Sequence, residues 1–248
     1  MEADEYDRMD RVEGSMWWYR ALHGRVLDAL SRWPGVASLP VLDAGCGTGG
    51  LLSRLAAAAP GRALAGLDLS TEAIRRARLK VPGAFLAVGS IGRLPFRDGG
   101  FGAAVSCDVL CHRMVDEQAA LAELHRVLAP GGTLILNLPA HAWLRSVHDE
   151  RVHTARRYDR RRLGRLLEQA GFRVLRLGHW NSLLLPLMVL QRKVLSRVGS
   201  GGGRSDVALF PPPIEAMFRA VTDVEAALAR LGVRYPAGGS ILAVASRS

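Results

Sequence analysis

The sequence has little cysteine, little lysine and no long apolar run. Three cysteines in 248 residues are too few for a disulfide framework, so we expect a reducing, cytoplasmic location. The acidic start, Met1 to Met9, lacks the apolar segment of a secretory signal. The apolar run at residues 183–190 is far shorter than the roughly 20 residues that a membrane-spanning helix needs.

The basic residues are almost all arginines. Lysine occurs only at Lys80 and Lys193, although lysine and arginine together number 33 and the formal net charge is +10. Abundant arginine and alanine with scarce lysine is typical of GC-rich bacterial genomes, so the charge alone does not predict a nucleic-acid partner. It favours anionic surfaces in general.

Four glycines fall within six positions after a short apolar segment. Residues 41–50 read Val-Leu-Asp-Ala-Gly-Cys-Gly-Thr-Gly-Gly, and a helix-forming segment, Leu51 to Ala59, follows at once. This order predicts a buried strand, a tight turn and the start of a helix, as in nucleotide-binding βα units. Glycine is expected there because a Cβ would keep the backbone from a ligand and because the turn can require a positive φ.

The acid before the loop bears on the ligand. Dinucleotide folds favour G-x-G-x-x-G, whereas this loop reads G-x-G-x-G-G with an acid two residues before its first glycine. The run D-A-G-C-G-T-G resembles the first motif of class I S-adenosylmethionine (SAM) methyltransferases. SAM is a cation without a pyrophosphate, and an acid suits its charges; the alternative is an acid that satisfies only the loop's own N–H groups. The resemblance implies that SAM is bound by Asp43, Gly45, Cys46, Gly47 and Gly49.

A second acid follows at the offset expected for ribose binding. Residues 63–68 predict a buried strand that ends in Asp68, about 20 residues beyond the loop. A carboxylate can accept hydrogen bonds from both ribose hydroxyls. We therefore predict cofactor contacts at Asp68 and Leu69, and a helix from Thr71 to Lys80 capped by Ser70.

Residues 89–96 resemble the G-D-A-x-x-L-P-F segment of the UbiE-like, type 11 branch of methyltransferases. In that family the acid contacts the adenine amine and the next residue packs on the ring, which implies these roles for Ser90 and Ile91. Serine replaces the acid here and can still accept one hydrogen bond.

The strand expected at residues 101–106 leads into Cys107, Asp108 and His112. Residues at the carboxyl end of a central strand line the crevice of an open α/β sheet, so we assign Cys107 to the cofactor site. The cysteines and His112 match no structural zinc spacing, and we predict no metal site.

The first 33 residues predict an amphipathic helical arm in one or two pieces, because apolar residues recur at spacings of three and four. Its Met-Trp-Trp-Tyr-Arg run at residues 16–20 has two interpretations. The aromatic residues pin the arm to the domain, or the arm is a lid whose Tyr19 or Arg20 covers the methionyl end of SAM, as the resemblance implies.

Three histidines, an acid and a tyrosine follow the fifth expected strand, at residues 141–158. A histidine hydrogen-bonded to a carboxylate is a usual base for removing a hydroxyl proton near neutral pH. We predict His148, beside Asp149, as the catalytic base, with His112 and His153 as alternatives.

The segment from Trp180 to Arg230 is interpreted as an insertion before the last strand. Its apolar run is either core or an interfacial lip over an acceptor pocket, flanked by Arg192, Lys193 and Arg197. Seven arginines between Arg151 and Arg165 are either a solvated helix face or part of the same acceptor side. The mixture predicts a partly apolar acceptor with an anionic or oxygen-rich part, and leaves a peripheral membrane contact open.

The order of elements predicts one α/β domain over residues 1–248. The resemblance implies a Rossmann-like, mostly parallel sheet of seven strands, with the last strand antiparallel and inserted between the fifth and sixth. The expected parts are the helical arm at 1–33, the cofactor-binding core at 34–178, the acceptor-side insertion at 180–230 and the final strand at 240–247.

These features predict a biosynthetic SAM-dependent methyltransferase. We favour O-methylation of a secondary metabolite, sugar or lipid-linked intermediate over N- or C-methylation, and expect a monomer or homodimer without a nucleic-acid partner. One alternative is an NAD(P)-dependent oxidoreductase, which is disfavoured because Tyr158 is followed by Arg162 and not by the lysine of a Tyr-x-x-x-Lys pair. The other is a non-enzymatic basic module that binds RNA or an anionic surface.

Overall fold

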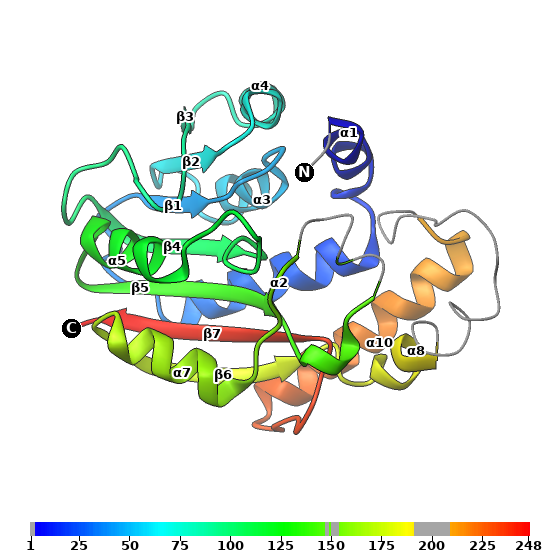
Figure 1. The fold of residues 1–248 in the computed structure, drawn as a ribbon. Helices are drawn as coiled ribbons and strands as arrows, with labels where there is room; N and C mark the ends of the chain where they lie inside the picture. The colour runs from blue at the N-terminus through cyan, green and yellow to red at the C-terminus, as the bar shows by residue number, and fades with distance from the viewer. Residues whose placement is uncertain (1–2, 147–148, 150–153, 191–208) are drawn as a thin grey trace.

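A central sheet with helices on both faces makes up the fold (Figure 1). The structure, a computed structural model, describes residues 3–146, 149, 154–190 and 209–248. The strands are β1 (Val41–Ala44), β2 (Leu64–Asp68), β3 (Phe85–Val88), β4 (Phe101–Cys107), β5 (Leu128–Pro139), β6 (Phe172–Trp180) and β7 (Ser240–Arg247). The helices are α1 (Ala3–Val12), α2 (Trp17–Arg32), α3 (Gly50–Ala58), α4 (Thr71–Lys80), α5 (Glu117–Val127), η1 (Ala142–Leu144), α7 (Arg160–Gln169), α8 (Leu185–Leu190) and α10 (Pro212–Arg230).

The strand order is β3-β2-β1-β4-β5-β7-β6. Strand β7 runs antiparallel to both its neighbours, whereas the pairs from β3 to β5 are parallel. This confirms the predicted Rossmann-like sheet with its last strand inserted. The strand order reverses between β1 and β4, so the turn after β1 opens onto the crevice in which such sheets bind ligands.

The central strands are buried on both faces, as parallel strands usually are. Leu42 and Ala104 pack with α5 and α7 on one face of the sheet. Val41 and Val105 pack with α2 and α3 on the other face. The alternation of side chains along each strand therefore divides the interior into two cores.

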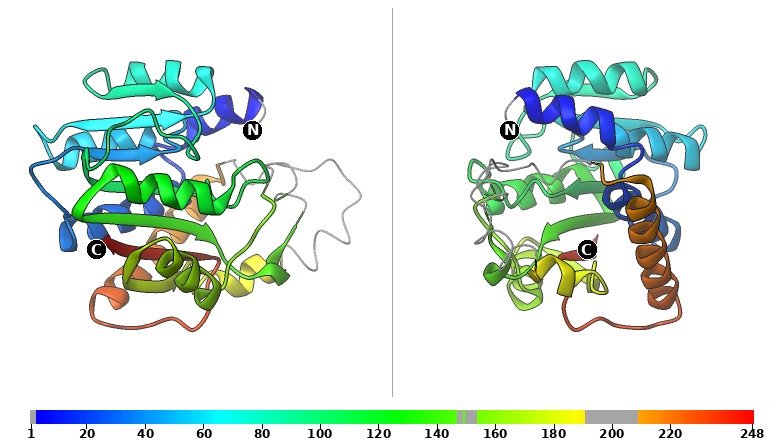
Figure 2. Two further views of the ribbon diagram at one scale, coloured as in Figure 1. Left: turned by 60° about the vertical axis from the view of Figure 1, so that its left-hand side comes forward. Right: turned by 90° about the vertical axis from the view of Figure 1, so that its right-hand side faces the viewer.

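The N-terminal arm consists of two helices in different places. Helix α2 belongs to the second core, whereas α1 lies beside α4 at the carboxyl ends of the strands (Figure 2). Helix α10 packs along α2, and the rings of Trp17 and Phe218 meet edge to face with centroids 5.3 Å apart. Trp18 stacks on Trp180 at 6.2 Å. These aromatic contacts fix α2 to the domain.

The loop between β5 and α7 turns back toward the end of β5 before α7 begins. Ala140 and Tyr158 form an isolated parallel bridge, and His112 pairs with Thr154 in an antiparallel one. The described part of this loop therefore lies against the residues that follow β4. His148 and His153 lie outside the described residues.

The insertion between β6 and β7 contains α8 and α10. It begins after Trp180 and not at it, because Trp180 is the last residue of β6 and pairs with Ser240. Residues 191–208, with Arg192, Lys193 and Arg197, fall outside the described part. No described helix combines the length and the apolar character needed to cross a membrane.

Candidate functional site

The turn after β1 has a backbone that favours glycine. Gly45, Gly47 and Gly49 all have positive φ values, of 92°, 52° and 89°. A Cβ on Gly45 would also lie 2.1 Å from Cγ2 of Val109, so a side chain there would clash with the loop after β4. The prediction that the turn requires positive φ is confirmed, and the close approach explains why the sequence keeps glycine at the first of these positions.

Asp68, at the end of β2, lies directly beside this turn. Its carboxylate accepts hydrogen bonds from the backbone N–H groups of Gly47 and Ser70, both at 2.9 Å. The hydroxyl of Tyr6 donates to the same carboxylate at 3.3 Å. The acid expected to bind the ribose is therefore oriented by the glycine turn and by the arm.

Asp43 is a buried acid that is influenced by two other acids. Its side chain is 2% exposed, and no hydrogen bond to its carboxyl group is found within the described residues. Burial, followed by the negative charges of Asp68 and Glu13, raises the pKa of Asp43 to about 8. A cationic ligand would stabilise the ionised form. The acidic groups at the turn therefore fit SAM, which carries positive charges and no phosphate.

The arm residues that contact the turn come from α1 and the residue after it. Buried Glu13 accepts from the Thr48 hydroxyl at 2.7 Å and from the Gly50 N–H at 3.2 Å, at the start of α3. A carboxylate is stabilised at a helix N-terminus by the exposed N–H groups and the helix dipole. Lys80, on α4, forms an ion pair with Glu13 and so helps to hold this residue beside the turn.

A row of ion pairs fastens α1 to α4. Asp7 and Asp10 pair with Arg76, and Asp10 also pairs with Lys80. The acids are spaced by three residues on one helix and the cations by four on the other, so each row lies on one helix face. The spacing is visible in the sequence, but the partner of each row is known only from the structure.

The other expected cofactor residues are distributed around Asp68 and the ends of β3 and β4. The Gly89 N–H donates to the Asp68 carbonyl at 2.9 Å, which places Ser90 beside β2, where its side chain is exposed. Ile91 is 4% exposed within the first core, whereas Leu69 is 70% exposed. Cys46 is buried in the second core, and Cys107 is half-buried at the end of β4.

Tyr19 and Arg20 lie on the first turns of α2. Arg20 is exposed, and the Tyr19 ring lies 5.1 Å from Trp18 and 6.0 Å from His23 between centroids. The role of Tyr19 and Arg20 at the methionyl end of SAM stays a prediction.

A hydrogen-bonded chain crosses the carboxyl ends of β4, β5 and β6. Asp108, directly after β4, has a φ of 55° and accepts from the Asn137 side-chain N–H at 2.9 Å. Buried Asn137 in turn accepts from the Trp180 indole N–H at 2.7 Å. Burial raises the pKa of Asp108 to about 7, although Asn137 and the positive charge of Arg157 oppose that rise. The chain holds a carboxyl group that ionises near neutral pH at the edge of the crevice.

Comparisons with known proteins agree with this geometry. Residues 42–136 match the methyltransferase domain family of type 11. An uncharacterized methyltransferase of Synechocystis sp. is 35% identical over 167 residues, which cover 62% of this chain and 74% of that protein. The demethylmenaquinone methyltransferase of Thermus thermophilus is 38% identical over 54% of this chain and 60% of its own length. The chain belongs to the class I SAM-dependent methyltransferases of the type 11 branch.

The fold of this methyltransferase also occurs in solved structures. A putative methyltransferase of Haloferax volcanii, solved with the Trm112 activator, superimposes with a TM-score of 0.64 at 21% identity, over 100% of this chain and 99% of that one. The chain covers between 48% and 74% of the length of the first curated relatives it matches. The cofactor of the methyltransferase is SAM, as its family establishes.

The loop after β5 is held by a buried ion pair. Asp149 accepts from the Arg157 guanidinium at 2.7 and 3.0 Å, and Arg157 also donates to the Ala140 carbonyl at 2.9 Å. Asp149 accepts from the Ser146 N–H at 2.8 Å as well. His112 is half-buried after β4, and Arg156 donates to its carbonyl at 3.0 Å. The role of His148, His112 or His153 as the catalytic base stays a prediction, because two of these histidines lie outside the described residues.

Replacing Asp68 with alanine should weaken SAM binding about ten-fold or more. The change removes a charge-assisted acceptor for the ribose and the partner of two backbone N–H groups. Isothermal titration calorimetry of the variant with SAM measures the effect. Asp98→Ala, an exposed acid on another loop, is the control and should bind like the wild type. Equal affinity in Asp68→Ala and wild type would remove Asp68 from the site.

SAM affinity should rise with pH up to about pH 8. Because the pKa of Asp43 is raised to about 8, its carboxyl group is mostly protonated at pH 6–7 and must lose a proton to pair with a cation. The contribution of Asp43 to the affinity should therefore increase by up to about ten-fold per pH unit below 8 and level off above it. The SAM ammonium also titrates near 8, so the Asp43→Asn variant serves as the control. SAM affinity is measured against pH for both proteins. A ratio of the two affinities that does not change with pH would contradict the prediction.

Proposed function

We propose that this methyltransferase transfers the methyl group of SAM to a hydroxyl oxygen of a small, partly apolar acceptor. The observation that carries the proposal is the carboxyl group of Asp108 at the carboxyl end of β4. Its Oδ2 is held by Asn137, which leaves Oδ1 for an acceptor hydroxyl. A carboxyl group whose pKa lies near 7 is suited to take a proton at neutral pH.

Each side of the reaction has its own part of the site. SAM, when bound, supplies a methyl group on a sulfonium sulfur that leaves as a neutral thioether. The glycine turn with Asp43 and Asp68 holds the cofactor, and Asp108 accepts the hydroxyl proton on Oδ1. Asn137 is a positioning residue that keeps the carboxyl group of Asp108 turned toward the crevice. Positioning and proton removal are the two contributions that an O-methyl transfer asks of the protein.

An apolar surface supports a partly apolar acceptor. Large apolar side chains are exposed on or just before α8 and on or just before the first turns of α10: Leu183, Leu187, Leu190, Leu209, Phe210, Ile214 and Met217. Exposed apolar side chains that gather into a patch mark ligand grooves, protein contacts or lipid contacts. We assign this surface to the apolar part of the acceptor.

The proposal is tested by incubating the protein with SAM and a panel of partly apolar acceptors that carry hydroxyl, amine or enol groups. Mass spectrometry should find a gain of one methyl on a hydroxyl acceptor, and fragmentation should place it on oxygen. Transfer only to nitrogen or carbon would contradict the proposed acceptor class while keeping the methyltransferase activity. Absence of any methyl transfer, with SAM bound, would contradict the small-molecule acceptor itself.

A further inference from the structure

A polar hollow lies at the carboxyl ends of β5 and β6, beside the first turns of α7. It is distinct from the glycine turn and from Asp108. Its lining combines two histidines, three arginines and one acid: His141, His179, Arg160, Arg161, Arg165 and Asp159.

The two histidines of the hollow have ring nitrogens without a well-formed hydrogen bond. His179 is 9% exposed, and its ring nitrogens lie near the backbone carbonyls of Tyr235 and Pro236 without reaching good hydrogen-bond geometry. Nε2 of His141 is buried and makes no hydrogen bond within the described residues. The rings stack with centroids 4.9 Å apart. Buried polar atoms without partners are costly, so the pair is suited to a ligand that accepts hydrogen bonds.

The histidines of this hollow act as neutral donors. Burial is the main cause that lowers the pKa of His141 and of His179, and the positive charges of Arg157 and Arg160 add to it. A neutral imidazole still carries one N–H group that can donate to an anion. His141 also has a φ of 55°, an unusual backbone for histidine that sets its ring against His179.

The three arginines of the hollow lie on the surface of α7. Arg160, Arg161 and Arg165 are exposed, and within the part of the chain that the structure describes none of them has an ion pair. Arg162, between them, is different because it pairs with Glu117 at 2.7 Å. The acid of the hollow, Asp159, caps α7 by accepting from the Arg162 N–H at 2.8 Å. Cations therefore outnumber acids at a helix N-terminus, where anions are favoured.

We propose that this hollow binds a phosphate or diphosphate group of the methyl acceptor, an inference that rests on the proposed function. Phosphate oxygens can accept from guanidinium groups, from imidazole N–H groups and from a helix N-terminus together. Asp108 follows β4, and the hollow lies at the ends of β5 and β6, which are one and three strand spacings away, or about 5 to 14 Å. The acceptor is therefore a phosphorylated molecule whose methylated atom lies roughly that far from its phosphate.

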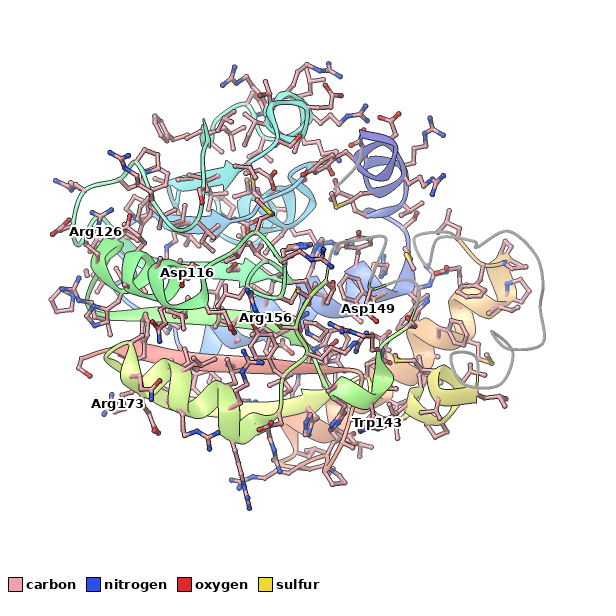
Figure 3. The ribbon with its side chains drawn as sticks, viewed as in Figure 1. Asp116, Arg126, Trp143, Asp149, Arg156 and Arg173 are labelled. Atoms are coloured by element: carbon pink, nitrogen blue, oxygen red, sulfur yellow. The ribbon has the colours of Figure 1, made fainter. Side chains whose placement is uncertain are left out.

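Titration with inorganic pyrophosphate tests the hollow without any turnover. The first variant is Arg160→Gln combined with Arg165→Gln, which changes exposed side chains and should fold normally. The second is His179→Phe, which keeps a ring against His141 and removes both nitrogens. The control is Arg173→Gln, the same charge change near the opposite end of β6; Figure 3 shows Arg173 far from Trp143, whose ring stacks on His141 at 5.5 Å.

Wild type and Arg173→Gln should bind pyrophosphate with the same Kd, and both test variants should bind it at least ten-fold more weakly. Equal weakening in the control would show non-specific charge attraction and overturn the proposal, as would absence of saturable binding to the wild type. Vesicles of phosphatidic acid, compared with phosphatidylcholine, identify the source of the phosphate. Retention on the acidic vesicles that is lost in the double variant supports a lipid phosphate, and its absence with pyrophosphate bound supports a soluble one. SAM is also titrated into the same samples. Normal SAM binding without pyrophosphate binding would contradict this site and leave the proposed function standing.

Discussion

Replacing Glu225 with alanine is expected to lower the free energy of unfolding by about 3–5 kcal/mol. Glu225, on α10, is 1% exposed and pairs with Arg25 of α2 at 3.0 Å. It also accepts from the N–H groups of Asn181, Ser182 and Leu183, at 2.7, 2.7 and 3.0 Å. Its removal leaves a buried guanidinium without its carboxylate and three backbone donors without an acceptor.

The effect of Glu225→Ala reaches beyond α10. The Arg25 guanidinium lies 4.5 Å from the centroid of the Trp180 ring, and Trp180 donates to Asn137 in the chain that ends at Asp108. Chemical denaturation monitored by circular dichroism measures the loss. Asp223→Ala, an exposed acid on the same helix, is the matched control and should change stability by less than about 0.5 kcal/mol. Similar small losses in both variants would show that the buried pair does not stabilise the fold.

Replacing Asp108 with asparagine should lower kcat about a hundred-fold or more while leaving SAM affinity unchanged. Asparagine keeps the size of the side chain and cannot take a proton. The measurement is turnover with an identified acceptor, beside calorimetric titration with SAM. In the wild type, turnover should increase as pH rises through about 7, because the base must be ionised and the pKa of Asp108 is raised to about that value.

The same assay decides between Asp108 and the histidines. His148→Ala, His112→Ala and His153→Ala are measured alongside Asp108→Asn. Near-normal turnover in Asp108→Asn, with a large loss in His148→Ala, would move the base to His148. If none of the four variants lost turnover, proximity would have to carry the reaction, as it can for an amine or enol acceptor.

The parts of the structure that depend on local pattern were predictable from the sequence. The glycine turn follows from four glycines after an apolar strand, because no other residue adopts its backbone at no cost. The cap of α4 by Ser70 follows in the same way and is confirmed by a hydrogen bond from the Ala73 N–H at 3.2 Å. Asp68 could be placed beside the turn because it ends β2, and the turn follows β1, the parallel neighbour of β2.

The contacts between distant segments were not predictable. The sequence directs attention to Tyr19 and Arg20 in the arm, whereas the described arm contacts with the turn come from Tyr6 and Glu13. Which helix reaches the crevice depends on how α1 pairs with α4, a contact between residues more than 60 apart in the chain. Glu225 is one of several acids on an amphipathic helix, and only packing against α2 shows that it is buried. The stacked histidine rings of the hollow also appear only in three dimensions.

Titration calorimetry of the ligand-free protein with SAM, and separately with NADH, tests the central claim most directly. The claim is that Asp43, Asp68 and the glycine turn form a cation-binding cofactor site and not a dinucleotide site. SAM should bind with a Kd in the micromolar range, a free energy of about −8 kcal/mol, and NADH should show no saturable binding. Binding of NADH in preference to SAM would contradict the site as described here.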